Sequence, residues 1–247
     1  AGRAFQDALV RARGRGVEVR VLIDDVGARY TRPTMIRVLR AAGVPVAAFL
    51  PTRIPRLFRY ANLRNHRKIL VVDGRVGFTG GINVRAGHWL SRRPARPVRC
   101  LHFRVDGPVV ADMQRAFAIV WDVAGEELGP EVLTDPLAIA PAGDVTLRVV
   151  AGTPNSVGTY RLDLTIASVA HQYLWLTDAY FVGTAAYVQA LAAAARDGVD
   201  VRLLVPGASD LPLVRTFTRA GYRGLLEGGV RVFEWNGPMM HAKSAVA

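Results

Sequence analysis

The stretch ALVRARGRGVEVRVLI (residues 8–23) repeats without a gap as ALAAAARDGVDVRLLV (residues 190–205). Further along the chain, LRAAGVPVAAF (residues 39–49) matches LLEGGVRVFEW (residues 225–235). A period this long exceeds that of solenoid repeats, so the sequence predicts a duplicated domain rather than an array. A glycine stands at the same place in both members of each pair, namely Gly16 and Gly198, then Gly43 and Gly229.

Each copy has the pattern of alternating helices and strands. The alanine-rich stretch before Gly16 or Gly198 has a helical apolar period and a glycine stop. The β-branched runs that follow are typical of strands buried in a sheet that is covered on both faces. The alternation predicts an α/β fold with parallel neighbouring strands. We expect strands at 17–24, 44–49, 173–177, 199–206 and 230–235, and second helices at 33–42 and 213–227.

A stretch rich in Pro, Gly and Ala, residues 136–154, is the expected linker between the halves. It would separate a first half, 1–135, from a second half, 155–247. A strand precedes the helix of the second copy but not that of the first. We therefore expect a piece of a longer protein, with the N-terminal strand of one half and the C-terminal part of the other outside it.

Composition excludes several classes of protein. Hydrophobic residues at 51% and charged residues at 21% exclude a disordered chain. No apolar run reaches the roughly 18 residues that span a bilayer, and no secretory leader opens the sequence. The single cysteine, Cys100, excludes an internal disulfide framework.

The basic charge is concentrated in the first half. The net charge is +12, and residues 1–123 carry 23 basic against 8 acidic side chains. Such an excess favours a polyanionic partner, either nucleic acid or an anionic lipid surface. A gene rich in G and C would also produce many arginines, so charge alone does not decide the partner.

The lysines are more informative than the total charge. Of the 32 basic residues only Lys68 and Lys243 are lysines, and each stands two residues after a histidine, His66 or His241. Lysine is a compact point charge and arginine a planar fork, so a site that requires the first does not accept the second. The two His-x-Lys pairs are therefore the candidate chemical groups of the two copies.

The first pair begins a longer motif. Residues two apart in a strand face the same side, so His66 and Lys68 are predicted to project together. An ammonium can neutralise a phosphate oxygen while an imidazole attacks phosphorus or protonates the leaving group. Asp73-Gly74 predicts a hairpin turn before a strand at 75–79. The motif ends in two glycines that allow close backbone approach and an amide that could reach the same phosphate: Gly80, Gly81 and Asn83.

The spacing HxK(x)4D(x)6GGxN resembles the signature of the phospholipase D superfamily. Three further stretches are similar to its bacterial cardiolipin synthase branch: AYFV, the run from GVDVRLLVPG onward, and LLEGGVRVFEWNGPMMHAK. The resemblance covers nearly the whole chain. It implies two α/β/α sandwich halves related by a pseudo-two-fold axis, with one active site at their interface.

The resemblance also implies roles for individual residues. His66 would be the nucleophile that forms a phosphohistidine, and His241 would be the general acid and base. Lys68, Lys243 and Asn83 would hold the phosphate oxygens. The family mechanism uses no metal and no cofactor, so we expect neither here. Asp73 completes the catalytic set, and Gly80 and Gly81 complete the phosphate-binding set.

Two departures from the family pattern concern the orientation of the histidines. The counterpart of Asp73 in the second motif would lie one residue past Ala247. Family members also carry an aspartate about thirty residues after the first motif that orients the nucleophilic histidine. Alignment places Cys100 there, which would deprive His66 of a carboxylate partner. A register shift that recruits Asp106 is the alternative, although burial normally specifies register.

The remaining candidates lack comparable context. His88, His102 and His171 are expected to be ordinary surface or packed residues. Asp24-Asp25 is expected to cap the next turn rather than bind metal. Residues 53–67, RIPRLFRYANLRNHR, form either an amphipathic lip in anionic headgroups or a helix packed on the protein.

The resemblance implies a phosphatidyltransferase that acts on an anionic phospholipid such as phosphatidylglycerol. Its place would be the cytoplasmic face of a bacterial membrane, bound peripherally or through segments outside these residues. The alternatives are a hydrolase of phospholipid or nucleic acid in the same superfamily, and a catalytically weakened member that binds lipid or phosphate. Nucleic acid is the less favoured partner, because no array of stacking aromatics accompanies the basic residues.

Overall fold

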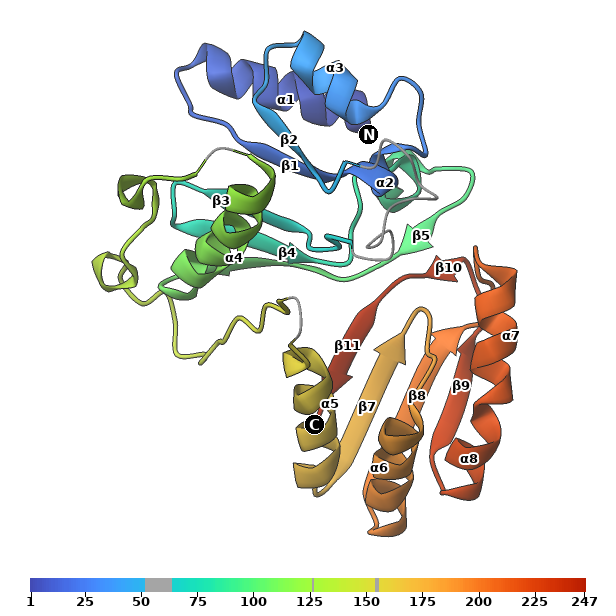
Figure 1. Cartoon of the computed structure of the whole chain (residues 1–247). Coiled ribbons are helices and arrows are strands. Elements are labelled where there is room, and N and C mark those ends of the chain that lie inside the picture. Colours follow the sequence, from blue (N-terminus) through green and yellow to red (C-terminus); the bar gives the residue numbers. More distant parts are fainter. Residues whose placement is uncertain (52–63, 126, 154–155) are drawn as a thin grey trace. The chain divides into compact units, whose positions relative to one another are not determined.

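The computed structural model describes residues 1–51, 64–125, 127–153 and 156–247, and it divides the chain into two compact units (Figure 1). The first unit comprises 1–79, 84–86 and 103–149, and the second comprises 80–83, 87–102 and 150–247. The second unit thus includes two segments that precede the expected linker. The half boundaries inferred from the repeat stay a prediction. Most of the stretch 53–67, proposed as a lip, lies outside the described residues.

The first unit contains a parallel strand pair and a three-stranded sheet. Its helix α4 (Val109–Ala124) packs against β2 and β3 and buries Val110, Met113 and Trp121. The strand pair joins β1 to β2, and the sheet has the order β3-β4-β6. The elements of this unit are α1 (Gly2–Gly14), β1 (Val21–Asp24), α2 (Asp25–Ala28), α3 (Met35–Ala41), β2 (Val46–Phe49), β3 (Ile69–Val72), β4 (Val76–Gly80), β6 (His102–Asp106), η4 (Pro130–Val132) and η5 (Pro136–Ala138).

The second unit is built on one four-stranded sheet of order β11-β7-β8-β9. β7, β8 and β9 are parallel, and β11 runs antiparallel to β7. A separate short parallel pair joins β5 to β10. The elements are η2 (Ala86–His88), η3 (Leu90–Arg92), β5 (Val98–Arg99), α5 (Gly158–Val169), β7 (Tyr173–Asp178), α6 (Ala185–Arg196), β8 (Asp200–Pro206), α7 (Pro212–Ala220), α8 (Tyr222–Glu227), β9 (Arg231–Trp235), β10 (Met239–Met240) and β11 (Lys243–Val246).

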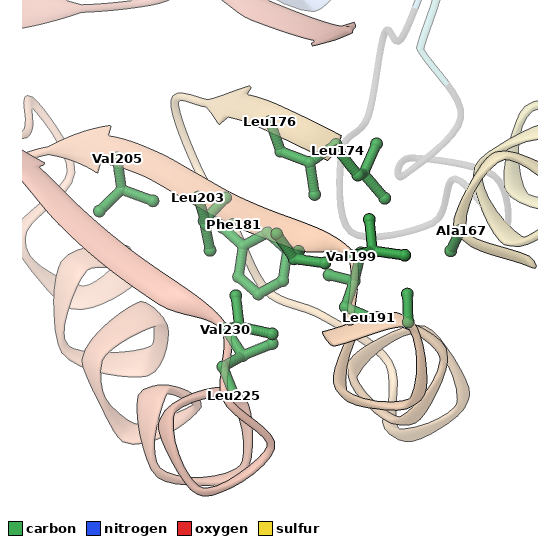
Figure 2. Close-up of a cluster of buried hydrophobic side chains, with 12 residues drawn as sticks. Ala167, Leu174, Leu176, Phe181, Leu191, Val199, Leu203, Val205, Leu225 and Val230 are labelled. Atoms are coloured by element: carbon green, nitrogen blue, oxygen red, sulfur yellow. The ribbon is translucent and has the colours of Figure 1, made fainter. Parts of the chain in front are cut away.

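The core of the second unit lies between this sheet and helices α5, α6 and α8 (Figure 2). In β8 the buried Val201, Leu203 and Val205 alternate with the half-buried Arg202 and Leu204. One face of this strand is thus fully buried and the other is half-buried. Both faces of a strand are fully buried only when both carry apolar side chains, and the charged Arg202 lies on the second face.

The repeat is confirmed in the backbone at the four glycines that define it. Gly16, Gly43, Gly198 and Gly229 all have positive φ, between 71° and 94°. In each case the next residue donates its N–H to the carbonyl five residues earlier, as Val17 does to Ala12 and Val199 to Ala194. This is a Schellman termination, which requires a left-handed residue and so favours glycine. Equivalent sequence positions thus perform the same local task.

Two expected elements differ from the prediction. The helix expected at 213–227 is divided into α7 and α8 at Gly221, which has the weakest helix propensity of any residue other than proline. The strand expected at 17–24 begins only at Val21, where pairing with β2 starts. The hairpin expected at Asp73-Gly74 is confirmed: both residues have positive φ (53° and 64°), as a type I′ turn requires.

Candidate active site

The two His-x-Lys pairs share one local geometry. In the first unit Lys68 Nζ donates to the carbonyl oxygen of His66 at 2.7 Å, and in the second unit Lys243 Nζ donates to that of His241 at 3.0 Å. Neither histidine lies in a strand, because β3 begins at Ile69 and β11 begins at Lys243. The prediction that the pairs lie within strands is therefore wrong in detail. Each lysine folds back over its own histidine's backbone at the start of a strand.

In the first unit the segment that carries His66 is fixed from both sides. Arg64 Nε donates to Asp24 Oδ2 at 3.0 Å, and Arg67 Nη1 donates to the carbonyl of Ala116 in α4 at 2.9 Å. The same Asp24 carboxylate accepts from Gly27 N at the start of α2, so its expected capping role is confirmed. His66 lies in the sequence between these two anchored arginines and is exposed.

Asp73 lies at the far end of β3 from Lys68, in the hairpin turn. At roughly 3.3 Å per residue, the four-residue strand separates the turn from the His66 pair by about 13 Å. Its inclusion among the catalytic residues stays a prediction. Asp73 forms part of the hairpin turn, and its short polar side chain tolerates the positive φ there.

In the second unit the segment 80–83 packs directly against His241. The Nδ1 atom of His241 lies 3.2 Å from the carbonyl oxygen of Gly81. A carbonyl oxygen only accepts hydrogen bonds, so Nδ1 carries the proton and Nε2 is left to exchange protons. The backbone of Gly81 thus fixes the tautomer of an imidazole from the other end of the sequence.

Both glycines of the GGxN element are required by close contacts. A Cβ on Gly80, whose φ is +144°, would lie 2.5 Å from the carbonyl oxygen of Leu101. A Cβ on Gly81 would lie 2.3 Å from Cys100 Sγ and 3.2 Å from the carbonyl oxygen of His241. The expected close backbone approach is present, and what approaches Gly81 in this unit is His241.

Cys100 is the second neighbour of His241. Its Sγ lies 3.8 Å from His241 Nδ1 and 3.2 Å from the His241 carbonyl oxygen. Within the second unit, Cys100 therefore lies against His241. The role of position 100 toward His66, which the resemblance implies, stays a prediction. The alternative partner, Asp106, belongs to the first unit and binds Arg104.

Two rings pack edge-on against His241, which is only 7% exposed. The His88 ring meets it edge-on at a centroid distance of 5.6 Å, and the Tyr180 ring does so at the same distance. His88 was expected to be an ordinary residue, and it is buried beside the candidate catalytic group. Sequence offers no signal for this contact, because His88 and His241 belong to different copies of the repeat.

Tyr180 connects the histidine to its lysine. The Lys243 ammonium lies 5.1 Å from the centre of the Tyr180 ring, which is a cation–π distance. The Tyr180 hydroxyl donates to Asp210 at 2.7 Å, and its backbone N–H donates to Asp178 at 2.9 Å. The ring is therefore held at both ends, by the loops that follow β7 and β8. The carboxyl ends of parallel strands are the usual place for ligand sites in such sheets.

Burial and charge act in opposite directions on the Lys243–Asp178 pair, which is in register between β11 and β7. Although much of Lys243 is exposed, its ammonium is crowded enough that burial lowers its pKa, while the charges of Asp178, Cys100 and Asp210 raise it. Burial raises the pKa of Asp178, opposed by the Tyr180 N–H and by Lys243. Each charge of the pair thus stabilises the other in a partly desolvated place.

The expected site residues are divided between the two units. His66, Lys68 and Asp73 belong to the first unit; Gly80, Gly81, Asn83, His241 and Lys243 belong to the second. Within the second unit Gly81, His241 and Lys243 are brought together, and Asn83 is half-buried two residues after Gly81. Within the described residues no cluster of three or more His, Cys, Asp or Glu side chains is arranged to hold a metal ion.

Comparison with known proteins gives the family. Residues 1–96 and 164–247 match the family model described as "Cardiolipin synthase, PLD-like domain". The chain belongs to this family. It is 35% identical over 249 residues to a cardiolipin synthase of Geobacillus kaustophilus and 37% identical over 244 residues to a cardiolipin synthase A of Pseudomonas fluorescens. These alignments cover 99% and 98% of this chain but only 49% and 50% of the relatives, so the chain spans about half their length.

A solved structure confirms the fold of this PLD-like chain. The phosphatidylserine synthase of Haemophilus influenzae superposes with a TM-score of 0.60 at 14% identity, over all of this chain and 67% of the other. The family match in two segments and this superposition agree with the predicted duplicated α/β fold. The resemblance to the cardiolipin synthase branch of the phospholipase D superfamily is confirmed as well.

Proposed function

We propose that this chain carries phosphatidyltransferase chemistry of the cardiolipin synthase type. The substrate would be an anionic phospholipid with a phosphatidylglycerol-like headgroup, and the reaction would join two such lipids with release of glycerol. The family match supports the reaction class. The observation that carries the proposal is His241, a buried imidazole whose Nδ1 proton is fixed by Gly81 and whose own lysine lies beside it.

The proposed reaction has two displacements at phosphorus. In the first, a ring nitrogen of neutral His66 attacks and the P–O bond to glycerol breaks. His241 is doubly protonated at this point, donates its Nε2 proton to the departing alkoxide and becomes the neutral Nδ1–H form. In the second, His241 removes the proton of the incoming lipid hydroxyl, whose oxygen attacks phosphorus as the P–N bond breaks. One difficult substitution is thereby divided into two easier ones.

The lysines and the GGxN element would bind the phosphate oxygens. Lys68 and Lys243 now donate to their own histidine's carbonyl, and a bound phosphate would offer each ammonium a charged acceptor instead. The Asn83 amide, in the same segment as Gly81, would add a neutral donor. Such preorganised donors act on the charge that develops in the transition state, and each is typically worth about 10²–10³ in rate.

We further propose that the protein works on a membrane surface, at the cytoplasmic face. The names of its relatives support a lipid substrate. Among the described residues, no helix combines the length and apolar character needed to cross a bilayer.

The test is product analysis with phosphatidylglycerol vesicles. The chain is expected to release glycerol and form cardiolipin in equal amounts, and His241→Ala should abolish both products. His171→Ala, which alters an exposed histidine in the same unit, is the matched control and should retain turnover. Phosphatidic acid as the only lipid product would overturn the transferase proposal in favour of hydrolysis. Full turnover by His241→Ala would overturn both.

A further inference from the structure

An exposed, purely basic loop adjoins the candidate site in the second unit. Residues 89–99, WLSRRPARPVR, are called here the arginine loop. The loop contains no acidic residue, and its apolar side chains at Trp89 and Leu90 are 36% and 46% exposed. Its four arginines are all exposed: Arg92, Arg93, Arg96 and Arg99.

Both ends of the arginine loop are attached to His241. At its start, the neighbouring His88 is buried with its ring edge-on to the His241 ring. At its end, Arg99 accepts the backbone N–H of His241 at 2.6 Å, and Cys100 follows with its thiol against the same residue. The loop therefore emerges from the candidate site and returns to it, with its arginines on the outside.

The positive charge of the loop is not neutralised within the described part of the chain. Ion pairs recorded there involve other arginines, and none joins a carboxylate to the four of the loop. Two of them instead lie over aromatic rings: Arg92 over Trp89 at 4.9 Å and Arg99 over Trp235 at 5.6 Å. Cationic side chains interleaved with exposed apolar ones are the composition of a surface that meets anionic headgroups.

Further exposed apolar side chains belong to the same unit. After the carboxyl end of β8, the chain presents Leu211, Leu213 and Phe217, which are 47%, 76% and 66% exposed. Leu213 and Phe217 are four residues apart in α7 and so share one face of that helix. Apolar groups of this kind gain free energy in the headgroup and acyl boundary, whereas a nucleic acid backbone offers them no comparable environment.

We propose that the arginine loop docks on an anionic lipid bilayer, with Arg92, Arg93 and Arg96 on the phosphates and with Trp89 and Leu90 inserted at headgroup depth. Tryptophan is favoured at this level because its ring is apolar and its N–H is polar. Docking in this way brings His241 to the surface from which a lipid phosphate must come. The inference rests on the membrane association in the proposed function and names the surface responsible for it. It holds whether or not the bound lipid is turned over.

The first experiment measures partition of the 247-residue chain onto vesicles of phosphatidylglycerol and phosphatidylcholine at low salt. The variant Arg92→Gln/Arg93→Gln/Arg96→Gln is expected to bind roughly 100-fold more weakly than the parent. The reason is that each arginine near the surface contributes about tenfold or less to the affinity for vesicles. The matched control Arg161→Gln/Arg196→Gln/Arg223→Gln removes the same charge from α5, α6 and α8 of the same unit. It should lose less than tenfold, and equal losses by the two triple variants would overturn the proposal.

The second experiment reads the depth of Trp89. Brominated phosphatidylglycerol is expected to quench part of the tryptophan emission, and Trp89→Phe should remove most of that quenching without changing vesicle binding more than severalfold. Quenching that survives in Trp89→Phe would contradict the proposed orientation.

Two further outcomes separate this inference from its alternatives. If the arginine variant bound vesicles normally but lost single-stranded DNA, the loop would be a nucleic acid surface and the proposal would be wrong. If vesicle binding behaved as expected while no cardiolipin formed, the proposed function would fail and the docking surface would stand. Turnover of a short-chain, monomeric phosphatidylglycerol should be retained by the arginine variant, which separates docking from catalysis.

Discussion

The two His-x-Lys pairs have the same local geometry and different surroundings. In each, the lysine ammonium donates to the carbonyl of its own histidine, and the preceding helices of both copies end in the same glycine termination. Yet His66 is exposed between two anchored arginines, whereas His241 is buried among Gly81, Cys100 and two rings. Short-range sequence therefore determines the pair, and segments distant in sequence determine what each imidazole can do.

The difference suits the two proposed roles. A nucleophile must reach phosphorus, so an exposed ring is useful. A general acid and base must present one defined nitrogen in a defined tautomer, which the Gly81 carbonyl provides for His241. Four predictions sharpen this comparison or break it.

The largest effect is expected from the lysines. Lys68→Ala and Lys243→Ala should each lower kcat/KM about 10²–10³-fold by removing a donor to the transition-state phosphate. Arginine should not restore activity at either position, because a planar fork does not replace a point charge. Steady-state kinetics on both pairs of variants check this. Normal activity of Lys68→Arg together with Lys243→Arg would show that any cation suffices.

Gly81→Ala should come next, with loss of turnover of roughly tenfold or more and destabilisation of about 1–3 kcal/mol from overpacking. The new Cβ would meet Cys100 Sγ at 2.3 Å and the His241 carbonyl at 3.2 Å. Adding Cys100→Ala removes the first of these contacts, so the double variant should recover part of both losses. A double-mutant cycle by chemical denaturation and kinetics measures the coupling. Strict additivity would mean that Cys100 does not press on this site.

Removal of the Asp178 charge should move the basic limb of the pH–rate profile. Asp178 raises the pKa of Lys243 against the lowering effect of burial. In Asp178→Asn the pKa of Lys243 falls further, the ammonium deprotonates at lower pH, and activity is lost earlier as pH rises. The control is Asp163→Asn in α5, which removes a charge near Asp178 that is not among those raising the pKa of Lys243. A basic limb that stays in place in Asp178→Asn, or moves equally in both variants, contradicts this assignment.

The smallest effect compares the two copies directly. Gly16 and Gly198 both have left-handed backbone and open space where a Cβ would be. Alanine at either position should therefore lower the free energy of unfolding by about 1–2 kcal/mol through backbone strain alone. Denaturant unfolding of the two variants should give similar losses. A large loss in one and none in the other would show that the repeat equivalence does not extend to energetics.

Local features of this chain could be predicted from its sequence, because they depend on neighbours in the chain. The glycine terminations, the Asp73-Gly74 hairpin and the Asp24 cap are all decided within a few residues. The division of the helix at Gly221 is also local, but apolar periodicity continues across that glycine and conceals it.

The surroundings of His241 could not be predicted, because they depend on chain segments more than a hundred residues away. Cys100 and Gly81 reach His241 through the pairing of β5 with β10, two strands of two residues each. Strands that short leave no periodicity in a sequence. The resemblance implies that position 100 orients a histidine, and the strand pairing places Cys100 beside His241.

The central claim is that the two imidazoles have different roles in one reaction. A phosphohistidine is hydrolysed in acid, so the reaction is quenched rapidly in base after mixing with phosphatidylglycerol labelled at phosphorus. Peptide mapping then locates the label. The account predicts label on His66 in the parent chain and no label in His66→Ala. It also predicts little or no label in His241→Ala, where the departing glycerol alkoxide lacks its proton donor. Label on His241 in the parent chain would contradict it.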